Sequence, residues 1–193
     1  MLKTQLNKIT PYNDQEKTDI ELFTQFLTRN EDAFLRSNLT AHVTSSAIIV
    51  NQQMDKILFA HHNIYGSWGW VGGHNDGEKD TLHVAIKEAK EETGLTHVEP
   101  VSEDIFMVDV IFVPNHYKHN KRIPDHLHLN VTYLLKANDR HPVYIKPDEN
   151  SGVRWFSFNE LLDFVNEPRM IPIYQKALEK INSIKHPKKS PQA

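Results

Sequence analysis

Gly72-Gly73-His74-Asn75-Asp76-Gly77 opens the stretch that decides the fold, residues 72–95, which read GGHNDGEKDTLHVAIKEAKEETGL. This stretch is predicted to form a glycine-rich turn followed by one helix. Asp80 is a suitable N-cap for that helix. Gly94 suits the position after its last turn, because glycine enters the left-handed backbone region at little cost.

Two stripes of side chains run along this predicted helix. The apolar stripe recurs at i, i+3, i+4 and i+7 and therefore faces a core: Leu82, Ala85, Ile86 and Ala89. The acidic stripe consists of Glu88, Glu91 and Glu92, which share one face at about 100° per residue. Carboxylates this close repel one another unless a divalent cation lies over them, and Mg²⁺ prefers such oxygens. An acidic surface helix without a cation is the alternative interpretation.

The stretch resembles the signature of the Nudix hydrolase family. That signature is a Gly, five residues, a Glu, seven residues, then Arg-Glu-aliphatic-x-Glu-Glu-x-Gly-aliphatic. Here Gly73 is followed at the family spacing by KEAKEETGL, which begins at Lys87. Lys87 stands where Arg is usual, and Lys79 stands where the first Glu is expected, with Glu78 one residue early. The opening resembles a family branch that begins its motif with Gly-Gly-His-x-Asp-Gly.

The resemblance implies a fold, a cofactor and a reaction. The fold is an α/β/α sandwich with a mixed β-sheet, here with an added N-terminal helical segment. The cofactor is Mg²⁺ or Mn²⁺, and the residues implied to hold it are Glu88, Glu91, Glu92 and the backbone carbonyl of Gly73. The reaction is hydrolysis of the diphosphate bond in a nucleoside diphosphate linked to another group.

A glutamate is implied as the general base that takes the proton of the attacking water. The candidate catalytic residues are Glu91 and Glu92 in the motif and Glu149, which precedes a predicted strand by a short loop. The residue types do not decide among them. For Glu149, a solvated loop carboxylate beside Asp148 is an equally good interpretation.

Two other functions are compatible with the same fold. A Nudix-fold module that binds a nucleotide without cleaving it is favoured by the Lys79 departure and disfavoured by the intact glutamates. An isoprenoid-type diphosphate isomerase is disfavoured because that chemistry uses a cysteine and the chain has none. The displaced Glu78 is expected to pair with Lys87 and brace the glycine loop against the helix, while Lys79 points to solvent.

Composition narrows the setting in which the protein acts. The net charge of −3 does not indicate the basic surface that nucleic-acid binding requires. No apolar run approaches membrane-spanning length. The absence of cysteine excludes disulfides, thiolate metal sites and cysteine nucleophiles. The N-terminal residues lack the apolar core of a signal peptide. A cytoplasmic protein with a small-molecule diphosphate substrate is expected, and a homodimer is left open.

The remaining patterns predict a single domain of 193 residues. Its expected parts are an N-terminal helical extension (1–40), a Nudix core (40–165), a C-terminal helix (166–185) and a disordered tail (186–193). Residues 1–12 are expected to be a loose arm, and Asp14 to cap a helix that reaches residue 28. Predicted strands cover 42–50, 57–62, 105–113, 125–135, 143–145 and 152–156. Further helices are expected from Ser157 or Asn159 to Val165 and after Pro172.

Histidines are frequent, and two of them alternate in a predicted strand. His126 and His128 lie on one face of the strand over 125–135. They are predicted to line the substrate cleft, because this segment resembles the branch's Asp-His-x-His. Hydrogen-bonded strand histidines and a transition-metal pair, as in cupin-like barrels, are the alternatives. The basic connection with Lys118, Lys121 and Arg122 is either a phosphate contact or an ordinary solvated loop.

Overall fold

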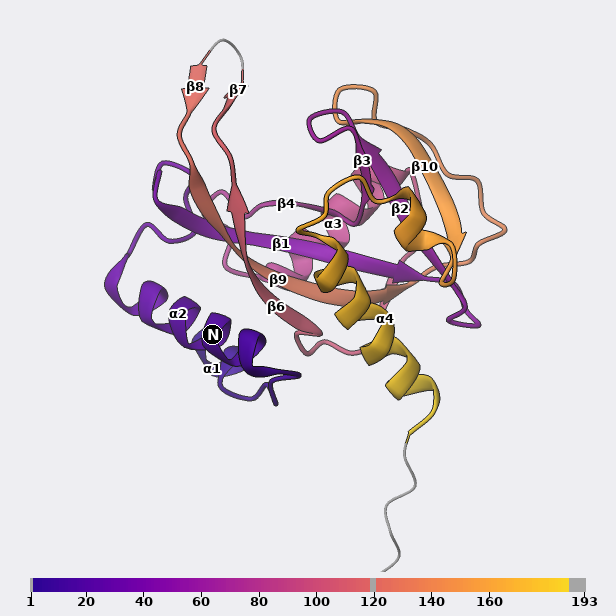
Figure 1. Ribbon diagram of the computed structural model, residues 1–193, viewed down its shortest axis with the longest axis horizontal. Helices are drawn as coiled ribbons and strands as arrows, with labels where there is room; N and C mark the ends of the chain where they lie inside the picture. The colour runs from indigo at the N-terminus through magenta and orange to yellow at the C-terminus, as the bar shows by residue number, and fades with distance from the viewer. Residues whose placement is uncertain (1, 119–120, 188–193) are drawn as a thin grey trace, which may run out of the picture.

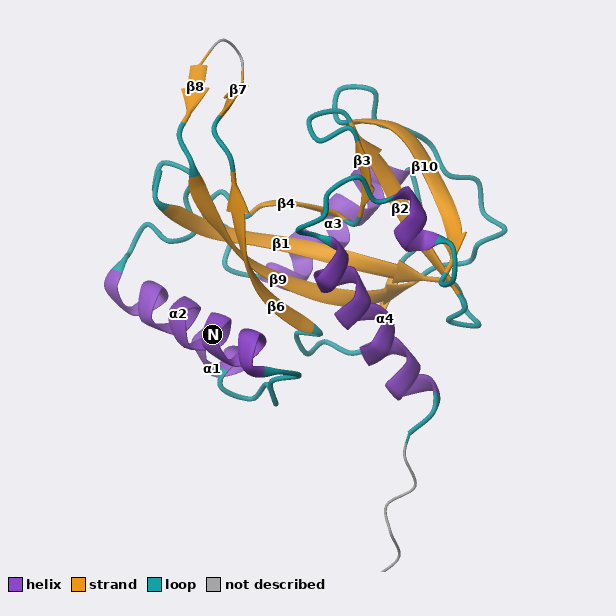
Figure 2. Ribbon diagram, viewed as in Figure 1, coloured by secondary structure: helices purple, strands orange, loops and turns teal. Residues whose placement is uncertain are grey.

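The computed structural model describes residues 2–118 and 121–187, apart from the side chain of Lys118. Its centre is a strongly curled sheet with helices on both faces, as Figure 1 and Figure 2 show. The helices are α1 (Leu2–Leu6), α2 (Asp14–Arg29), α3 (Thr81–Thr93), the 3₁₀ helix η1 (Leu161–Phe164) and α4 (Ile171–Lys185). The predicted α/β/α sandwich with a mixed sheet is confirmed.

Ten strands belong to two sheets within the described residues. They are β1 (Ala41–Val50), β2 (Lys56–His62), β3 (Ser67–Gly69), β4 (Val71–His74), β5 (Glu99–Pro100), β6 (Met107–Val113), β7 (His116–Lys118), β8 (Lys121–Ile123), β9 (His126–Lys136) and β10 (Asn150–Ser157). The main sheet runs β10-β2-β1-β9-β5, with β3 on β2, β4 on β1 and β6 on β9. β1 and β9 are parallel, whereas their other partners are antiparallel.

β1 is buried along its whole length, so its two faces belong to two different cores. Ala47 and Ile49 point toward α3, where Ala85 and Ala89 complete the contact. Ile48 and Val50 point to the opposite face, where α4 contributes Tyr174, Ala177 and Ile181. Figure 1 shows α4 in front of the sheet and α3 behind it. Toward the start of β1 the α4 face turns polar, with His42, Thr44 and Ser46.

The motif helix forms as its sequence predicts. Asp80 is the N-cap of α3, and its side chain accepts a hydrogen bond from the backbone N–H of His83. Gly94 ends the helix with a φ of 70°, in the left-handed region that favours glycine. The hydroxyl of Thr81 contacts that of buried Tyr133 on β9 at 2.7 Å. Local capping and one long-range hydrogen bond therefore hold the two ends of the stretch.

The N-terminal segment differs from the prediction in two details. The expected loose arm contains α1, because Leu2 and Leu6 are buried in the core. The cap of α2 is Asn13, whose side chain accepts from the N–H of Glu16, and Asp14 is already helical. Buried apolar anchors that meet the core only in the folded state explain why local pattern missed α1.

Carboxylates of α2 accept hydrogen bonds from the backbone N–H groups along the edge of β6 that does not face β9. Glu16 Oε1 accepts the N–H of Val108 at 3.0 Å, and Asp19 Oδ2 accepts the N–H of Val110 at 3.1 Å. On the other side, Lys176 of α4 donates to Asp109 at 2.7 Å and contacts Glu16 at 3.4 Å. Unpaired strand edges invite association with other chains, so this polar brace protects β6 while it joins α2 and α4 to the sheet.

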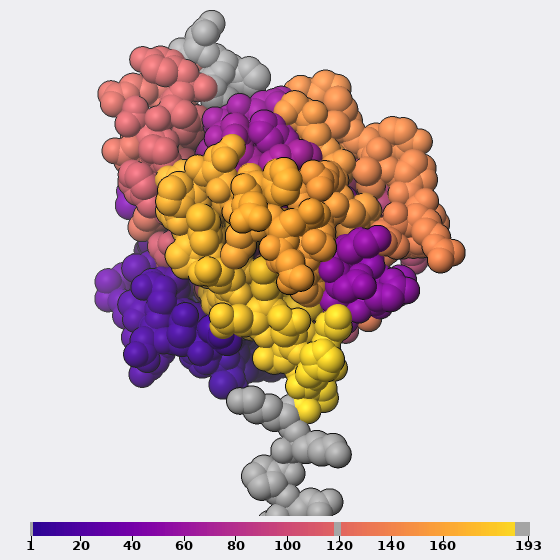
Figure 3. All heavy atoms as spheres, turned by 45° about the vertical axis from the view of Figure 1, so that its right-hand side comes forward, coloured from indigo at the N-terminus to yellow at the C-terminus, as the bar shows by residue number. Residues whose placement is uncertain are grey.

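Three further predictions are corrected by the structure. In the connection over 114–124, β7 and β8 pair as antiparallel strands, which project from the body in Figure 1 and Figure 3. Pro114 and Pro124 flank this pair, and because proline lacks an N–H they separate it from the β6–β9 ladder. Residues 143–145 are not a strand: the N–H of Tyr144 donates to the Thr93 carbonyl at the end of α3 at 2.8 Å, and the side chains of Tyr144 and Ile145 are exposed. The helix expected up to Val165 is only the short η1.

Other boundaries agree with the patterns. The strands expected over 42–50, 57–62, 105–113, 125–135 and 152–156 correspond to β1, β2, β6, β9 and β10. Pro172 lies in the first turn of α4. The tail predicted to be disordered falls largely outside the described residues, which end at 187. Among the described residues, no helix is long and apolar enough to cross a bilayer.

Lys176→Met is expected to destabilise the protein by roughly 3–5 kcal/mol, because it leaves the carboxylates of Glu16 and Asp109 buried without their main cation. Urea unfolding followed by circular dichroism measures this loss. Lys17→Met, on the exposed side of α2, is the matched control and should change the unfolding free energy by less than about 0.5 kcal/mol. Equal stability of the two variants would contradict a bracing role for Lys176.

Candidate active site

Three carboxylates from two segments converge beside β4. Glu88 and Glu92 are one turn apart on α3, and Glu149 comes from the loop before β10. One oxygen of each lies within 4.8 Å of the others. Glu92 is buried and Glu88 is half-buried, whereas the Glu149 side chain is 42% exposed. Oxygen donors gathered in this way match the ligands that Mg²⁺ and Mn²⁺ accept in proteins.

Gly73 allows α3 to approach the sheet this closely, and Gly72 allows β4 to lie this close to β1. A Cβ on Gly73 would lie 2.6 Å from the carboxyl carbon of Glu88, and one on Gly72 would lie 2.5 Å from the hydroxyl oxygen of Ser46. Neither glycine has a positive φ, so space rather than backbone conformation demands glycine here. The Gly72 N–H donates to Glu92 Oε1 at 2.8 Å. The backbone of β4 is therefore part of the carboxylate site.

Glu91 lies at the rim of this site and is held by lysines. Its carboxylate is 3.6 Å from Lys87 Nζ and 3.4 Å from Lys146 Nζ. Lys146 also contacts Glu149 at 3.1 Å, so it links the loop carboxylate to the helix. Of the predicted ligands, the structure thus brings Glu88 and Glu92 together at Gly73, with Glu149 added and Glu91 beside them.

The expected brace between Glu78 and Lys87 is not formed within the described part of the chain. Glu78 instead accepts the backbone N–H of Asp80 at 2.8 Å, and Asn75 donates to the Glu78 carbonyl. Lys87 contacts Glu88 and Glu91. The glycine loop is held by Asn75, which is buried and also accepts from the Ser45 hydroxyl at 2.8 Å. An amide hydrogen-bond network therefore replaces the expected ion pair.

Burial raises the pKa of two carboxyl groups of the site, Glu92 and Glu88. It raises the pKa of Glu92 from 4.5 to about 8, although the Gly72 N–H opposes the shift. It also raises the pKa of Glu88, against the attraction of Lys87. Glu92 therefore holds a proton at neutral pH when no cation is bound. A divalent ion would reverse this preference by favouring the carboxylate form.

His62 is a neighbour of Glu92 that sequence patterns did not single out. Its Nε2 donates to the Trp70 carbonyl at 2.7 Å, so Nδ1 is the lone-pair side and lies 3.7 Å from Glu92 Oε2. Burial lowers the pKa of His62 and keeps the ring neutral. The sequence places His62 in a predicted strand but does not indicate this contact. His62 on β2 and Glu92 on α3 come together only when the sheet folds.

A second polar cluster consists of histidines on the opposite face of the sheet. His42 of β1, His74 of β4 and His128 of β9 offer ring nitrogens within 4.8 Å of one another. His126 lies beside them, with its Nε2 at 3.3 Å from that of His128. Burial, followed by the neighbouring imidazoles, lowers the pKa of His128 from 6.5 to about 2. Sequence reasoning found His126 and His128, but not His42 or His74.

A model of the NUDIX domain family matches residues 40–177, which include the glycine loop, α3 and the Glu149 loop. The chain belongs to the Nudix family. Helix α3 is therefore the Nudix helix of this protein. A comparison with curated proteins found no match.

Solved Nudix structures share the fold at low sequence identity. A C. elegans Ap4A hydrolase binary complex is 18% identical with a TM-score of 0.54, over 73% of this chain and 98% of that chain. A NUDIX family hydrolase from Clostridium perfringens is 22% identical with a TM-score of 0.53, over 72% and 96%. The E. coli dihydroneopterin triphosphate pyrophosphohydrolase is 12% identical with a TM-score of 0.54, over 71% and 94%. These likenesses concern the fold alone.

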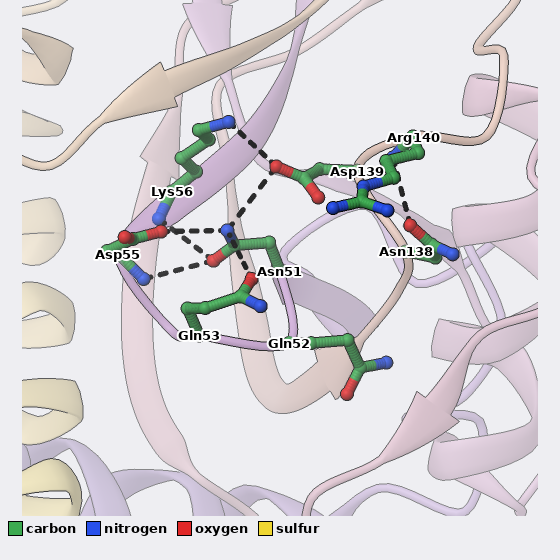
Figure 4. A pocket seen from close by; sticks show the side chains of 8 residues that line it. All are labelled: Asn51, Gln52, Gln53, Asp55, Lys56, Asn138, Asp139 and Arg140. Atoms are coloured by element: carbon green, nitrogen blue, oxygen red, sulfur yellow. Dashed lines mark hydrogen bonds and ion pairs between the residues drawn. The ribbon is translucent and has the colours of Figure 1, made fainter.

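A large surface hollow lies away from the Nudix helix. It has a volume of about 600 Å³ and is lined by the β1–β2 turn and the loop after β9, as Figure 4 shows. Its polar groups are engaged with one another: Asn51 donates to Asp55 at 2.7 Å, and Lys56 pairs with Asp139 at 2.7 Å. These internal contacts stabilise the turn, so we do not assign the active site to this hollow despite its size.

In a chelating buffer, the unfolding free energy of Glu92→Gln is expected to increase relative to that of the wild type as the pH rises. In the wild type the folded-state pKa of about 8 lies above the unfolded value near 4.5, so the unfolding free energy falls across that interval. Glutamine keeps an acceptor for the Gly72 N–H and has no charge to bury. The melting temperature of the variant relative to wild type should rise between pH 5 and pH 9 by on the order of 5 °C.

Glu91→Gln is the matched control for this measurement, because the Glu91 side chain is 42% exposed and lies beside two lysines. Its difference from wild type should not grow in the stabilising direction over the same pH interval. A Glu92→Gln difference that is constant with pH would contradict a buried, protonated Glu92.

Proposed function

We propose that the protein is a Nudix hydrolase that cleaves the diphosphate bond in a nucleoside diphosphate linked to another group, with Mg²⁺ or Mn²⁺ as its cofactor. The observation that carries the proposal is the convergence of Glu88, Glu92 and Glu149 beside the Gly73 backbone. An acidic helix without a cation would have no reason to bury Glu92 against β4 at the cost of desolvation.

The donor set fits a hard divalent cation. Glu88, Glu91, Glu92 and the Gly73 carbonyl are the proposed ligands, all of them oxygen donors. When bound, the ion would neutralise phosphate oxygens and lower the pKa of a water molecule. The side chain that Gly73 lacks leaves room for this arrangement, since a Cβ there would displace the Glu88 carboxylate.

The protein's own residues would position the substrate water and take its proton. The proposed catalytic residues are Glu91, Glu92 and Glu149. Glu149 and Glu91 are the better candidates for the base, because each carboxylate is 42% exposed and can reach a water. Lys146 contacts both and so fixes the distance between them. Glu92 is buried and bonded to Gly72, which suits a ligand better than a proton shuttle.

The substrate class is supported by the family and by what related folds contain. The NUDIX domain of Shewanella oneidensis NrtR, 14% identical with a TM-score of 0.51, was solved with ADP ribose. A nucleoside diphosphate with a second group attached is the same class of molecule. His126 and His128, predicted to line the substrate cleft, belong to the histidine cluster on the face of the sheet opposite the Nudix helix, and their contact with the substrate stays a prediction. A cytoplasmic location and the absence of nucleic-acid and membrane partners stay predictions, and a homodimer is left open.

A nucleotide-binding module without catalysis is the second candidate. It is favoured by Lys87, which lies 3.4 Å from Glu88 and so occupies the edge of the carboxylate site. A screen of diphosphate compounds with Mg²⁺ and Mn²⁺, read by mass spectrometry, separates the two. Metal-dependent products identify a hydrolase, whereas retention of an intact nucleotide with no product identifies a binding module. An isomerised product would indicate the third, isoprenoid-type chemistry.

Millimolar Mg²⁺ or Mn²⁺ is expected to raise the melting temperature of the wild type, because an ion that binds only the folded state stabilises it by mass action. Glu88→Gln should reduce this rise by at least half, since it removes one ligand. Lys79→Gln, at an exposed loop position, is the control and should keep the full rise. A wild-type midpoint that does not respond to either ion would rule out the proposed cation site.

Glu91→Gln, Glu92→Gln and Glu149→Gln are each expected to lower kcat by roughly 100-fold at saturating metal, while the fold is retained. The variant that lacks the general base should in addition lose the acidic limb of the pH–rate profile, because no carboxylate titrates there. Steady-state rates between pH 5 and pH 9 measure both effects. Near-wild-type turnover of all three variants would refute the catalytic assignment.

A further inference from the structure

The histidine cluster lies where three strands meet at the polar end of the sheet. His42 is directly opposite His128 in the parallel β1–β9 pair, and His74 is opposite Thr44, one step along the same face of β1. Because side chains alternate along a strand, all three rings leave the sheet on the face away from the Nudix helix. Gly73 and His74 are neighbours in the chain, but Gly73 faces Glu88 on the Nudix-helix side of the sheet, whereas the His74 ring lies on the opposite side. The cluster is therefore separate from the carboxylate site.

The spacing of the rings matches that of ligands around one metal ion. In a tetrahedral site with Zn–N bonds near 2.0–2.1 Å, two ring nitrogens lie about 3.4 Å apart and two ring centres about 5.2 Å apart. The ring centres are 5.0 Å apart for His42 and His74, 5.1 Å for His42 and His128, and 5.0 Å for His74 and His128. All three pairs are thus close to the required separation before any ion is bound.

The orientation of His42 is also that of a metal ligand. Its Nδ1 lies 3.0 Å from the Asn38 carbonyl, which can only accept, so Nδ1 carries the proton. Its Nε2 therefore presents a lone pair, and this atom is buried with no hydrogen-bond partner. The ring as a whole is 3% exposed. Leaving a buried hydrogen-bond acceptor without a partner costs free energy. A metal-binding imidazole usually donates the N–H of its other ring nitrogen to a carbonyl or carboxylate, which fixes the orientation of the ring.

The ring of His126, which lies beside that of His42, is oriented in the same way by a backbone carbonyl. Its Nδ1 lies 2.8 Å from the Pro124 carbonyl, so its Nε2 also presents a lone pair to the cluster. That Nε2 is 3.3 Å from Nε2 of His128. A hydrogen bond between the two rings accounts for this contact without an ion. It does not account for Nε2 of His42, which remains without a partner.

We propose that His42, His74 and His128 form a binding site for a transition-metal ion, with Zn²⁺ as the first choice, on the face of the sheet opposite the Nudix helix. Neutral imidazoles suit Zn²⁺, Cu²⁺ or Ni²⁺ rather than Mg²⁺, which prefers oxygen, so the two sites select different ions. Three protein ligands leave a fourth position for water, for His126 or for an anionic group of a ligand. The inference does not rest on the proposed hydrolase activity.

The test uses the full chain without an affinity tag, stripped of metal and then loaded with Zn²⁺ in the presence of excess Mg²⁺. Bound zinc is measured by mass spectrometry, and affinity by competition with a chelating indicator. Wild type is expected to retain one zinc ion per chain. His42→Ala and His128→Asn should each lower zinc affinity by at least ~100-fold. Co²⁺ loaded in place of zinc should show the visible absorption of a tetrahedral nitrogen site, which His42→Ala abolishes.

Two controls make the result decisive. His83→Ala removes an exposed histidine of the Nudix helix and should leave zinc binding unchanged. Glu88→Gln alters the carboxylate site and should also leave it unchanged, whether or not the protein hydrolyses any diphosphate. Zinc that is lost in Glu88→Gln but kept in His42→Ala would assign the ion to the carboxylates and overturn the proposal. A wild type that binds no zinc would overturn it as well. Circular dichroism of each variant excludes loss of fold as the cause.

Discussion

The active-site side of this protein depends on how closely the Nudix helix approaches β4. Gly72 and Gly73 have no room for a Cβ, because β1 lies against one and the Glu88 carboxylate against the other. Close packing of this kind transmits small changes directly into the site. It brings two helical carboxylates against a strand backbone, and it forces one of them, Glu92, out of water.

Buried carboxylates occur in two places, the brace around Lys176 and the carboxylate site, and their charge is compensated differently in each. At the brace, Lys176 accompanies Glu16 and Asp109 into the interior, so the buried carboxylates have a permanent cation. At the site, Glu92 has the Gly72 N–H and no cation within bonding distance among the described side chains, and burial raises its pKa to about 8. The brace is therefore complete without a ligand, whereas the carboxylate site would gain stability from the proposed cation. This contrast is consistent with a structural role for the Lys176 cluster and with the proposed cation-binding role of the carboxylates.

The curled sheet also separates two kinds of donor. Oxygen donors gather on the α3 face at Gly73, and nitrogen donors gather on the other face at His74. One strand of four residues, β4, thus contributes to both clusters. Since hard cations prefer oxygen and transition metals accept imidazole, the two proposed ions would not compete for the donors on either side of this strand.

The sequence by itself determined the Nudix helix, its caps at Asp80 and Gly94, its acidic stripe and most of the strands. These features follow from helical and strand periodicity and from glycine's backbone freedom, which act within a few residues. Only the tertiary structure decided that Glu149 joins Glu88 and Glu92, that His62 faces Glu92, and that His42 and His74 join His128. It also decided against a strand at 143–145 and against the Glu78–Lys87 pair. These outcomes depend on strand pairing and helix packing between distant segments, and no local pattern carries that information.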